Sequence, residues 1–428
     1  MPGTRTADLL IINASELVTM AGRRKPRQRE DMASVHAVPE GAVAIRDGLI
    51  LACGRTPDIL SRFRQRKGSP LDVRGKTVIP GFVDPHTHLV FAGSRENELV
   101  MKLEGASYME ILASGGGIQR TVRATRAASD RELLRGALDR LERMLLHGTT
   151  TVEGKSGYGL ELDTEMRMLI AMEMAGMRQP VDVVRTFMGA HAVPPEYKGR
   201  PDDYIDFLVR TALPEVVRLK LAEFCDVFCE EGVFTVAQSR RLLLAAKRMG
   251  LGLKLHADEI VRTRGAELAA EVGAVSADHL YRSSKEGLER MKEAGVVGVL
   301  LPASCLSLLQ RDFPDARMMV SMGLPLALAT DLNPNCLTES MPFTIALACY
   351  KLRLTPSEAL TAATINAACA IGRQNEVGSL EPGKKADIAI LDAPNHLHIP
   401  YHFGVNLVET VIKDGKVEVK NGARVAKV

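Results

Sequence analysis

The sequence predicts an α/β protein: a closed (β/α)8 TIM-like barrel with a small β-sandwich domain formed from both chain ends. Over residues 77–334, eight short apolar, β-branched runs alternate with longer segments of helical period, which indicates repeated βα units around a parallel sheet. Strand-like runs also lie on both sides of this region, and each flank alone is too thin to bury a core. The chain of 428 residues is long enough for such a barrel with additions.

The eight predicted barrel strands are short and rich in Val, Ile, Thr and Leu. They cover residues 77–83, 149–153, 183–189, 226–228, 251–256, 274–278, 296–301 and 325–330. Between them, apolar residues recur every three or four positions. This period predicts helices over residues 130–146, 163–176, 239–249 and 284–294. The long gap after the first strand predicts an insertion.

The chain ends carry hairpin signals. Asp-Gly turns at residues 47–48 and 414–415 each separate two strand-like runs, as tight hairpins require. We expect the two ends to pair. The predicted division is residues 1–76 and 376–428 for the two parts of the small β domain, and residues 77–375 for the barrel.

Composition excludes several function classes. Lys+Arg is 55 and Asp+Glu is 52, so the net charge of +3 does not indicate a nucleic-acid or membrane surface. The apolar runs are shorter than a membrane helix, and the first residues lack the pattern of an export signal. Seven scattered cysteines indicate a reducing compartment. We expect a cytoplasmic protein without a nucleic-acid or membrane partner, and a solvated loop over the basic residues 23–29.

Histidine and aspartate residues fall where predicted strands end. His86 and His88 close the first strand, His256 ends the fifth, His279 ends the sixth and Asp331 ends the eighth. Strand ends of a barrel share one rim, so these side chains are expected to converge. With His86, His88, His256 and Asp331 as ligands, a divalent metal has three nitrogens, one carboxylate oxygen and a position for water.

This arrangement resembles the amidohydrolase superfamily, whose members hydrolyse amides and amidines with a metal-bound hydroxide in a (β/α)8 barrel. Segments 75–88 and 378–387 resemble that family's entry into the barrel and its exit into the small β domain. Further motifs resemble the imidazolonepropionase family within it. They lie at residues 90–98, 115–117, 153–160, 189–191 and 226–230.

The resemblance implies a reaction. It is the hydrolysis of the cyclic amide of 4-imidazolone-5-propanoate to N-formimidoyl-L-glutamate in histidine degradation, with metal-bound water as the nucleophile. It also implies one divalent metal per chain, either zinc or iron, and a homodimer. The small-molecule substrate carries an anionic propionate arm, which a planar Arg fork suits.

Site residues follow from this chemistry. The expected catalytic residues are Glu259, His279 and Asp331. Glu259 follows His256 by three residues and is expected to take or relay the proton of water, while His279 polarises the ring carbonyl or orients the water. The division of proton transfer among the three stays open. The expected substrate-binding residues are Arg95, Tyr158, His191, Glu259, Asn333 and Asn335.

One motif departs from the family pattern, and other functions stay open. Asn335 and Cys336 stand where the family usually has Gly and a small hydroxyl residue. The backbone and hydroxyl contacts that the family makes at these two positions are therefore not carried over to this chain. Besides the leading hypothesis, the sequence allows a deaminase of an aromatic base, since His256, Glu259 and His279 resemble those enzymes too. A binuclear amidase is less favoured because the fourth strand has no bridging lysine. A scaffold without activity is disfavoured because all four metal ligands are present.

Overall fold

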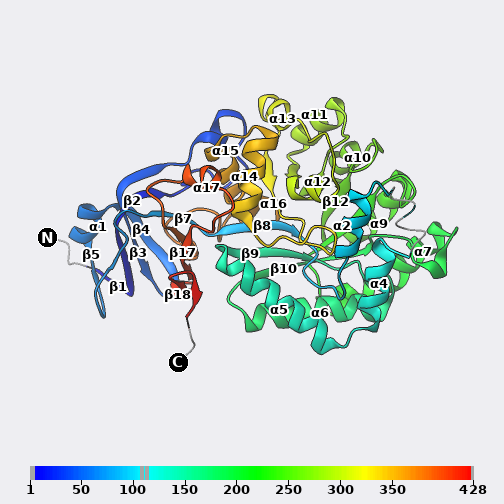
Figure 1. Cartoon of the computed structure of the whole chain (residues 1–428), viewed down its shortest axis with the longest axis horizontal. Coiled ribbons are helices and arrows are strands. Elements are labelled where there is room, and N and C mark those ends of the chain that lie inside the picture. The colour runs from blue at the N-terminus through cyan, green and yellow to red at the C-terminus, as the bar shows by residue number, and fades with distance from the viewer. Residues whose placement is uncertain (1–4, 107–109, 111–114, 426–428) are drawn as a thin grey trace.

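A barrel and a sheet built from both chain ends lie side by side in the computed structural model (Figure 1), which describes residues 5–106, 110 and 115–425. Eight parallel strands form the barrel in sequence order. They are β8 (Phe82–Thr87), β9 (Thr149–Lys155), β10 (Asp182–Ala190), β11 (Phe224–Cys229), β12 (Gly252–Ala257), β13 (Ser276–His279), β14 (Val297–Leu300) and β15 (Leu326–Leu328). The predicted (β/α)8 barrel is thus confirmed.

The barrel closes where β15 meets β8. The His88 N–H donates to the Leu332 carbonyl at 2.8 Å, and the Asp331 N–H donates to the His86 carbonyl at 3.2 Å. Closure therefore brings the end of the last strand beside the end of the first, although these segments lie more than two hundred residues apart in the chain.

Helices surround the barrel on its outer side (Figure 1). Those between or after the barrel strands are α2 (Glu96–Leu103), α4 (Ile118–Ala127), α5 (Asp130–Leu146), α6 (Leu162–Arg178), α7 (Pro201–Phe207), α8 (Leu213–Arg218), α9 (Val236–Arg248), α10 (Gly265–Val272), α11 (Lys285–Ala294), α12 (Pro302–Ser307), α13 (Ala316–Met322), α14 (Met341–Leu352), α15 (Pro356–Ala362) and α16 (Ile365–Ala370). Ser129 and Thr235 begin α5 and α9 with capping boxes, which satisfy N–H groups that a helix start leaves free. The four predicted helices are present with shifts of at most three residues at their ends.

Both chain ends contribute to one nine-stranded sheet. Its strands are β2 (Leu9–Val18), β3 (Ala37–Arg46), β4 (Leu49–Arg55), β6 (Leu71–Asp72), β7 (Thr77–Pro80), β16 (Ile388–Leu391), β17 (Val408–Lys413), β18 (Lys416–Lys420) and β19 (Ala423–Arg424). The two-stranded sheet of β1 (Arg5–Ala7) and β5 (Phe63–Gln65) and helix α1 (Thr56–Arg62) pack against β2, β3 and β4 around Leu10, Ala44 and Phe63. Helix α17 (His398–Tyr401) lies between β16 and β17. The expected pairing of the two ends is confirmed.

One predicted strand is wrong. Residues 77–83 do not form a single barrel strand, because β7 pairs with β16 and β2 in the end sheet and the barrel begins at Phe82. The chain passes between the two sheets at Gly81, whose N–H donates to the Asp387 carbonyl at 2.9 Å. A Cβ at Gly81 would lie 2.4 Å from Thr150 Oγ1, so only glycine fits this crossing. We therefore propose Gly81, rather than residue 77, as the start of the barrel domain.

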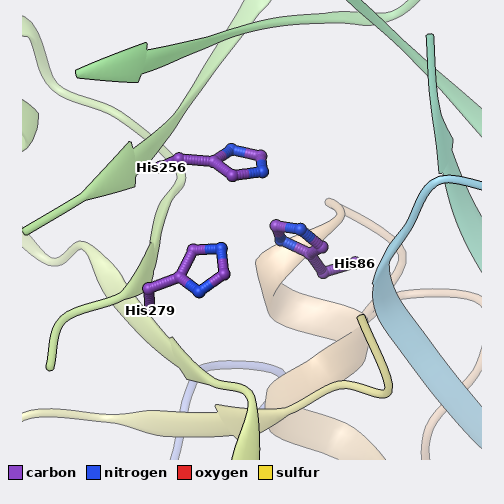
Figure 2. A group of neighbouring side chains, drawn as sticks. All are labelled: His86, His256 and His279. Atoms are coloured by element: carbon purple, nitrogen blue, oxygen red, sulfur yellow. The ribbon is translucent and has the colours of Figure 1, made fainter. Parts of the chain in front are cut away.

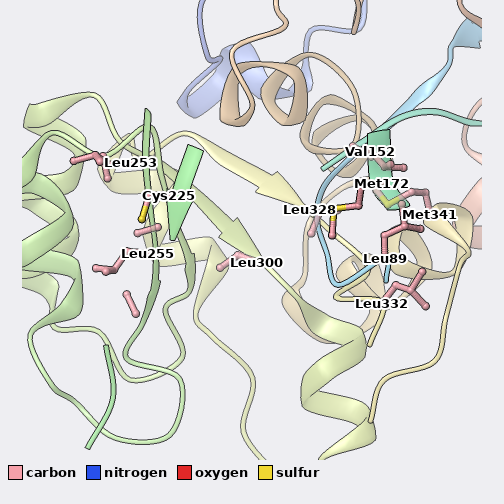
Figure 3. Close-up of a cluster of buried hydrophobic side chains, with 14 of the residues drawn as sticks. Leu89, Val152, Met172, Cys225, Leu253, Leu255, Leu300, Leu328, Leu332 and Met341 are labelled. Carbon is pink, nitrogen blue, oxygen red and sulfur yellow. The ribbon is translucent and has the colours of Figure 1, made fainter. Parts of the chain in front are cut away.

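The core lies largely between the barrel strands and their helices. Figure 3 shows part of it, where Val152 of β9, Met172 of α6 and Leu328 of β15 are buried together with leucines of neighbouring segments. Such close packing fixes the strand ends that carry the site. None of the helices in the described ranges has the length and apolarity that a bilayer crossing requires.

Candidate metal centre and active site

Five side chains converge at the carboxyl ends of four barrel strands. His86 lies in β8 with His88 just after it, His256 lies in β12, His279 ends β13, and Asp331 follows β15. Figure 2 shows the rings of His86, His256 and His279 pointing toward one another from their three strands. The ring centroids of His86 and His256 are 4.5 Å apart.

The ligand atoms of three overlapping groups lie within 4.8 Å of one another. The groups are His86, His256 and His279; His88, His191 and His256; and His86, His88 and Asp331. Asp331 Oδ1 lies 3.5 Å from His86 Nε2 and 3.9 Å from His88 Nε2. Around a tetrahedral divalent metal with bonds near 2.0–2.1 Å, ligand atoms stand about 3.4 Å apart. Each of the three groups is therefore compact enough to hold one ion.

The chemistry of these nitrogens also fits a metal. His86 Nδ1 lies 2.6 Å from Asp278 Oδ2, and His256 Nδ1 lies 3.0 Å from Asp226 Oδ1, so each ring is oriented by a carboxylate. Among the described residues, the Nε2 atoms of His86 and His256 and the Nδ1 atom of His88 are buried without a hydrogen-bond partner. Burial alone makes such an atom costly, and a metal would satisfy it.

The protonation states agree with this role. Burial, together with nearby cationic and imidazole groups, holds the pKa of His86 and His88 well below the usual value. Neutral imidazole is the form that binds metal. The residues present thus fit a divalent ion.

His279 is fixed as one tautomer. The Tyr281 hydroxyl donates to the Leu301 carbonyl at 2.8 Å, so its oxygen accepts from His279 Nδ1 at 3.2 Å. This pairing places the proton of a neutral His279 on Nδ1 and leaves Nε2 as an acceptor. Burial and the neighbouring His256 keep its pKa well below the usual value. Glu259 Oε1 lies 3.7 Å from the same Nδ1 atom.

Two site residues have left-handed backbones. The φ angle is 75° at His279 and 53° at Asp331, a region that non-glycine residues seldom adopt. Each such residue costs about 1–3 kcal/mol and concentrates where function demands a side-chain direction. The strain coincides here with the two strand ends that aim an imidazole and a carboxylate into the centre.

A tight loop holds Tyr158 between two glycines. The buried Glu165 carboxylate accepts N–H groups of Gly157, Gly159 and Leu160, and so fixes the loop. Gly157 has a φ of 110°, and its carbonyl lies 3.1 Å from His191 Nδ1. The His191 ring then stacks on His88, with centroids 4.6 Å apart and planes 9° apart. The loop thus positions Tyr158 at the cavity and orients His191.

A cavity of about 400 Å³ joins these residues. Its lining includes His88, Arg95, Tyr158, His191, His256, Glu259, His279, Asp331, Asn333 and Asn335. His86 does not line the cavity but is buried against His256, which does. The structure therefore brings together every residue that the sequence analysis assigned to the site, although their roles stay predictions.

Several residues around the cavity had no predicted role. Glu98 and Lys102 both line the cavity. Glu98 Oε2 lies 2.7 Å from Nη2 of the predicted residue Arg95. Beneath the histidines, Lys155 lies 2.6 Å from Asp226 and 3.4 Å from Asp278. Spacing on a helix could have indicated Glu98, three residues after Arg95. Lys155 and Asp226 lie within motifs of the sequence analysis, and Asp278 ends a predicted strand, but only barrel closure shows that the three meet.

Comparisons with known proteins agree with this geometry. The amidohydrolase family profile matches residues 77–417. An imidazolonepropionase of Geobacillus kaustophilus is 52% identical over 418 residues, covering 97% of this chain and 98% of the relative. An imidazolonepropionase of Symbiobacterium thermophilum is 52% identical over 421 residues, covering 98% of this chain and 99% of the relative. Among solved structures, a zinc-bound adenosine deaminase of Xanthomonas campestris has a TM-score of 0.73 at 19% identity, covering 100% of this chain and 96% of that one, which shows a shared fold.

Proposed function

The chain belongs to the amidohydrolase family and to its imidazolonepropionases, and from this premise we propose how its residues open the cyclic amide of 4-imidazolone-5-propanoate to N-formimidoyl-L-glutamate. The reaction is a hydrolysis of a carbon–nitrogen bond in histidine degradation. One observation carries the assignment of the site: the buried imidazoles of His86, His88 and His256 have nitrogens without partners among the described residues, and His88 and His256 line one cavity with Asp331 and Arg95.

His86, His88, His256 and Asp331 would hold one divalent metal, zinc or iron. When bound, the ion lowers the pKa of a coordinated water toward neutrality and so supplies the nucleophile. Three nitrogen ligands and one carboxylate suit either element, because imidazole binds both. Asp278 and Asp226 keep His86 and His256 in the tautomer whose Nε2 atom is free.

Glu259, His279 and Asp331 handle the protons. The Nε2 atom of His279 has no proton in the neutral ring, so it accepts a hydrogen bond from the attacking water and orients it toward the ring carbonyl. Burial and the nearby carboxylates of Asp331 and Glu230 raise the pKa of Glu259 well above the usual value, which makes it a better proton acceptor. Asp331 would carry a proton to the leaving nitrogen.

The substrate is bound by its two ends. The Arg95 guanidinium, held by Glu98 through Nε and one Nη2 hydrogen, offers its remaining Nη1 and Nη2 hydrogens to the propionate carboxylate. Burial raises the pKa of Tyr158, so its hydroxyl stays protonated and donates. His191, with a pKa lowered to about 3 by burial and by His256, presents Nε2 as an acceptor for a ring N–H. Asn333 and Asn335 complete the polar lining.

We also propose a cytoplasmic homodimer without nucleic-acid or membrane partners. Its support is the family resemblance, a near-neutral net charge of +3 and seven cysteines that are all free thiols.

The test is the loss of ultraviolet absorbance of freshly prepared 4-imidazolone-5-propanoate on adding the protein. It is run beside His256→Ala and a chelator-treated sample, with metal content measured in each. We expect loss with the wild type and none with either control. Release of ammonia from guanine or cytosine, with the imidazolone untouched, would replace the proposal with a deaminase.

A further inference from the structure

Helix α2 presents a row of charges to the cavity. Arg95 precedes the helix, and Glu98 and Lys102 follow at i+3 and i+7, positions that share one helical face. All three side chains line the cavity. Leu99, Val100 and Leu103 are exposed, so the polar face of α2 points inward and its apolar side chains lie on other faces. This distribution reverses the usual pattern for a barrel helix and indicates a functional inner face.

The carboxylate of Glu98 serves Arg95 and not Lys102. Its Oε2 atom accepts from Arg95 Nε at 2.9 Å and Nη2 at 2.7 Å, while Oε1 accepts from the Gly117 N–H at 2.8 Å. Glu98 and Lys102 stand at the i, i+4 spacing of helical ion pairs. Within the described residues, however, the ion pairs join Glu98 to Arg95 alone.

Lys102 therefore bonds only neutral oxygens among the described residues. Its Nζ atom donates to the Ser307 carbonyl at 2.9 Å and to Asn335 Oδ1 at 2.9 Å. An ammonium group has three donors, so one remains after these two bonds. Burial lowers the pKa of Lys102, and so does repulsion from the neighbouring Arg95 cation. The pair Arg95 and Lys102 faces one carboxylate, and this end of the cavity carries an excess positive charge.

The departure from the family pattern lies at the same place. Asn335 stands where the family has glycine, and its side chain both lines the cavity and holds Lys102. Cys336 stands in place of a small hydroxyl, is buried, and directs Sγ to the Thr330 carbonyl at 3.6 Å. In the described chain this thiol does not line the cavity.

We propose that Lys102, positioned by Asn335, is a second cationic anchor for the propionate carboxylate of the substrate, beside Arg95. This inference rests on the proposed function. Arg95 binds the carboxylate through the Nη1 and Nη2 hydrogens that Glu98 does not use, and the free Nζ donor of Lys102 bonds the same group. Lys102 thus contributes to selecting an anionic arm over a neutral one of equal shape.

The experiment compares 4-imidazolone-5-propanoate with its propanamide analogue, which has a neutral arm. The variant is Lys102→Gln, because the glutamine amide still donates a hydrogen bond but carries no charge. We expect KM for the acid to rise about 10- to 100-fold, as for loss of one charge-assisted bond, with a smaller change in kcat. The propanamide KM stays within about twofold. Lys102→Arg restores most of the preference for the acid.

The controls separate the possible failures. Lys285→Met removes a charge from the exposed start of α11 and should leave both KM values unchanged. Thermal unfolding and metal content of each variant report on folding, and Lys102→Met provides a second neutral side chain. Equal losses for the acid and the propanamide would make Lys102 a structural tether and overturn the inference. A wild type that turns over neither compound would instead overturn the proposed function.

Discussion

Lys155 Nζ lies 2.6 Å from Asp226 Oδ2 beneath the histidines, and neither side chain reaches solvent. The same ammonium lies 3.4 Å from Asp278 Oδ2. Asp226 orients His256 and Asp278 orients His86, so one lysine links the supports of two proposed metal ligands. Glu153 balances the charge, bonding Lys155 at 2.9 Å and Lys254 at 2.8 Å. The residues that orient the histidines therefore belong to a buried network of five charged groups: Glu153, Lys155, Asp226, Lys254 and Asp278.

Replacing Lys155 should weaken metal binding as well as the fold. Lys155→Met leaves Asp226 and Asp278 buried without their cation, which we expect to lower the free energy of unfolding by about 3–5 kcal/mol. The loosened carboxylates should weaken zinc affinity about 10- to 100-fold. Urea unfolding and zinc competition with a chelator measure the two effects. Lys413→Met is the matched control, since Lys413 is also buried but pairs with Asp387 and Asp414 in the end sheet; equal affinity losses would contradict the link.

Gly157→Ala should disturb the substrate site through His191. A Cβ there would lie 2.8 Å from the Met188 carbonyl oxygen and 2.9 Å from His191 Cβ, at a φ of 110°. We expect a loss of about 1–3 kcal/mol in unfolding free energy and a raised KM as the imidazole shifts. Gly250→Ala is the control. Gly250 also has a positive φ, of 89°, but no atom lies within 4 Å of an added Cβ, so the KM of this variant should match that of the wild type. The idea fails if Gly157→Ala also keeps the wild-type KM.

Glu259→Gln should separate catalysis from metal binding. The amide cannot take a proton from water, so kcat should fall about 10²- to 10⁴-fold. Zinc affinity and unfolding temperature should stay near those of the wild type, because Glu259 is not a proposed ligand. The exposed Glu231→Gln serves as the control. A large loss of zinc from Glu259→Gln would assign this carboxylate to the metal instead.

Glu358 should make stability depend on pH. Burial raises its pKa, but hydrogen bonds from Arg317 and Thr355 outweigh this and leave the pKa lowered. Such a group stabilises the fold above its unfolded pKa of about 4.3, and the contribution is lost as the pH falls through the folded pKa. Glu358→Gln, which keeps the capping box, should therefore cost about 1 kcal/mol at pH 7 and progressively less below about pH 4. Urea unfolding of Glu358→Gln and the wild type at pH 7 and at about pH 3.5 tests this.

The exposed Glu286 and Arg290 pair provides the comparison for that measurement. Glu286→Gln should cost no more than about 0.5 kcal/mol at pH 7. A constant Glu358→Gln effect between pH 7 and pH 3.5 would show that the charge of Glu358 does not stabilise the fold.

The sequence by itself determined the barrel, the pairing of the chain ends and the residues that meet at the rim. These depend on local patterns: short apolar, β-branched runs, segments of helical period, Asp-Gly turns, and His or Asp at strand ends. The tertiary structure alone decided where the first strand divides, because β7 and β8 are both buried and only the pairing of β7 with β2 and β16 in the end sheet marks the crossing at Gly81. The tertiary structure also decided which charged side chains form ion pairs. Lys155 has Asp226 and Asp278 as partners, and Glu98 bonds Arg95 while leaving Lys102 to neutral oxygens, because barrel closure and the path of α2 set these distances.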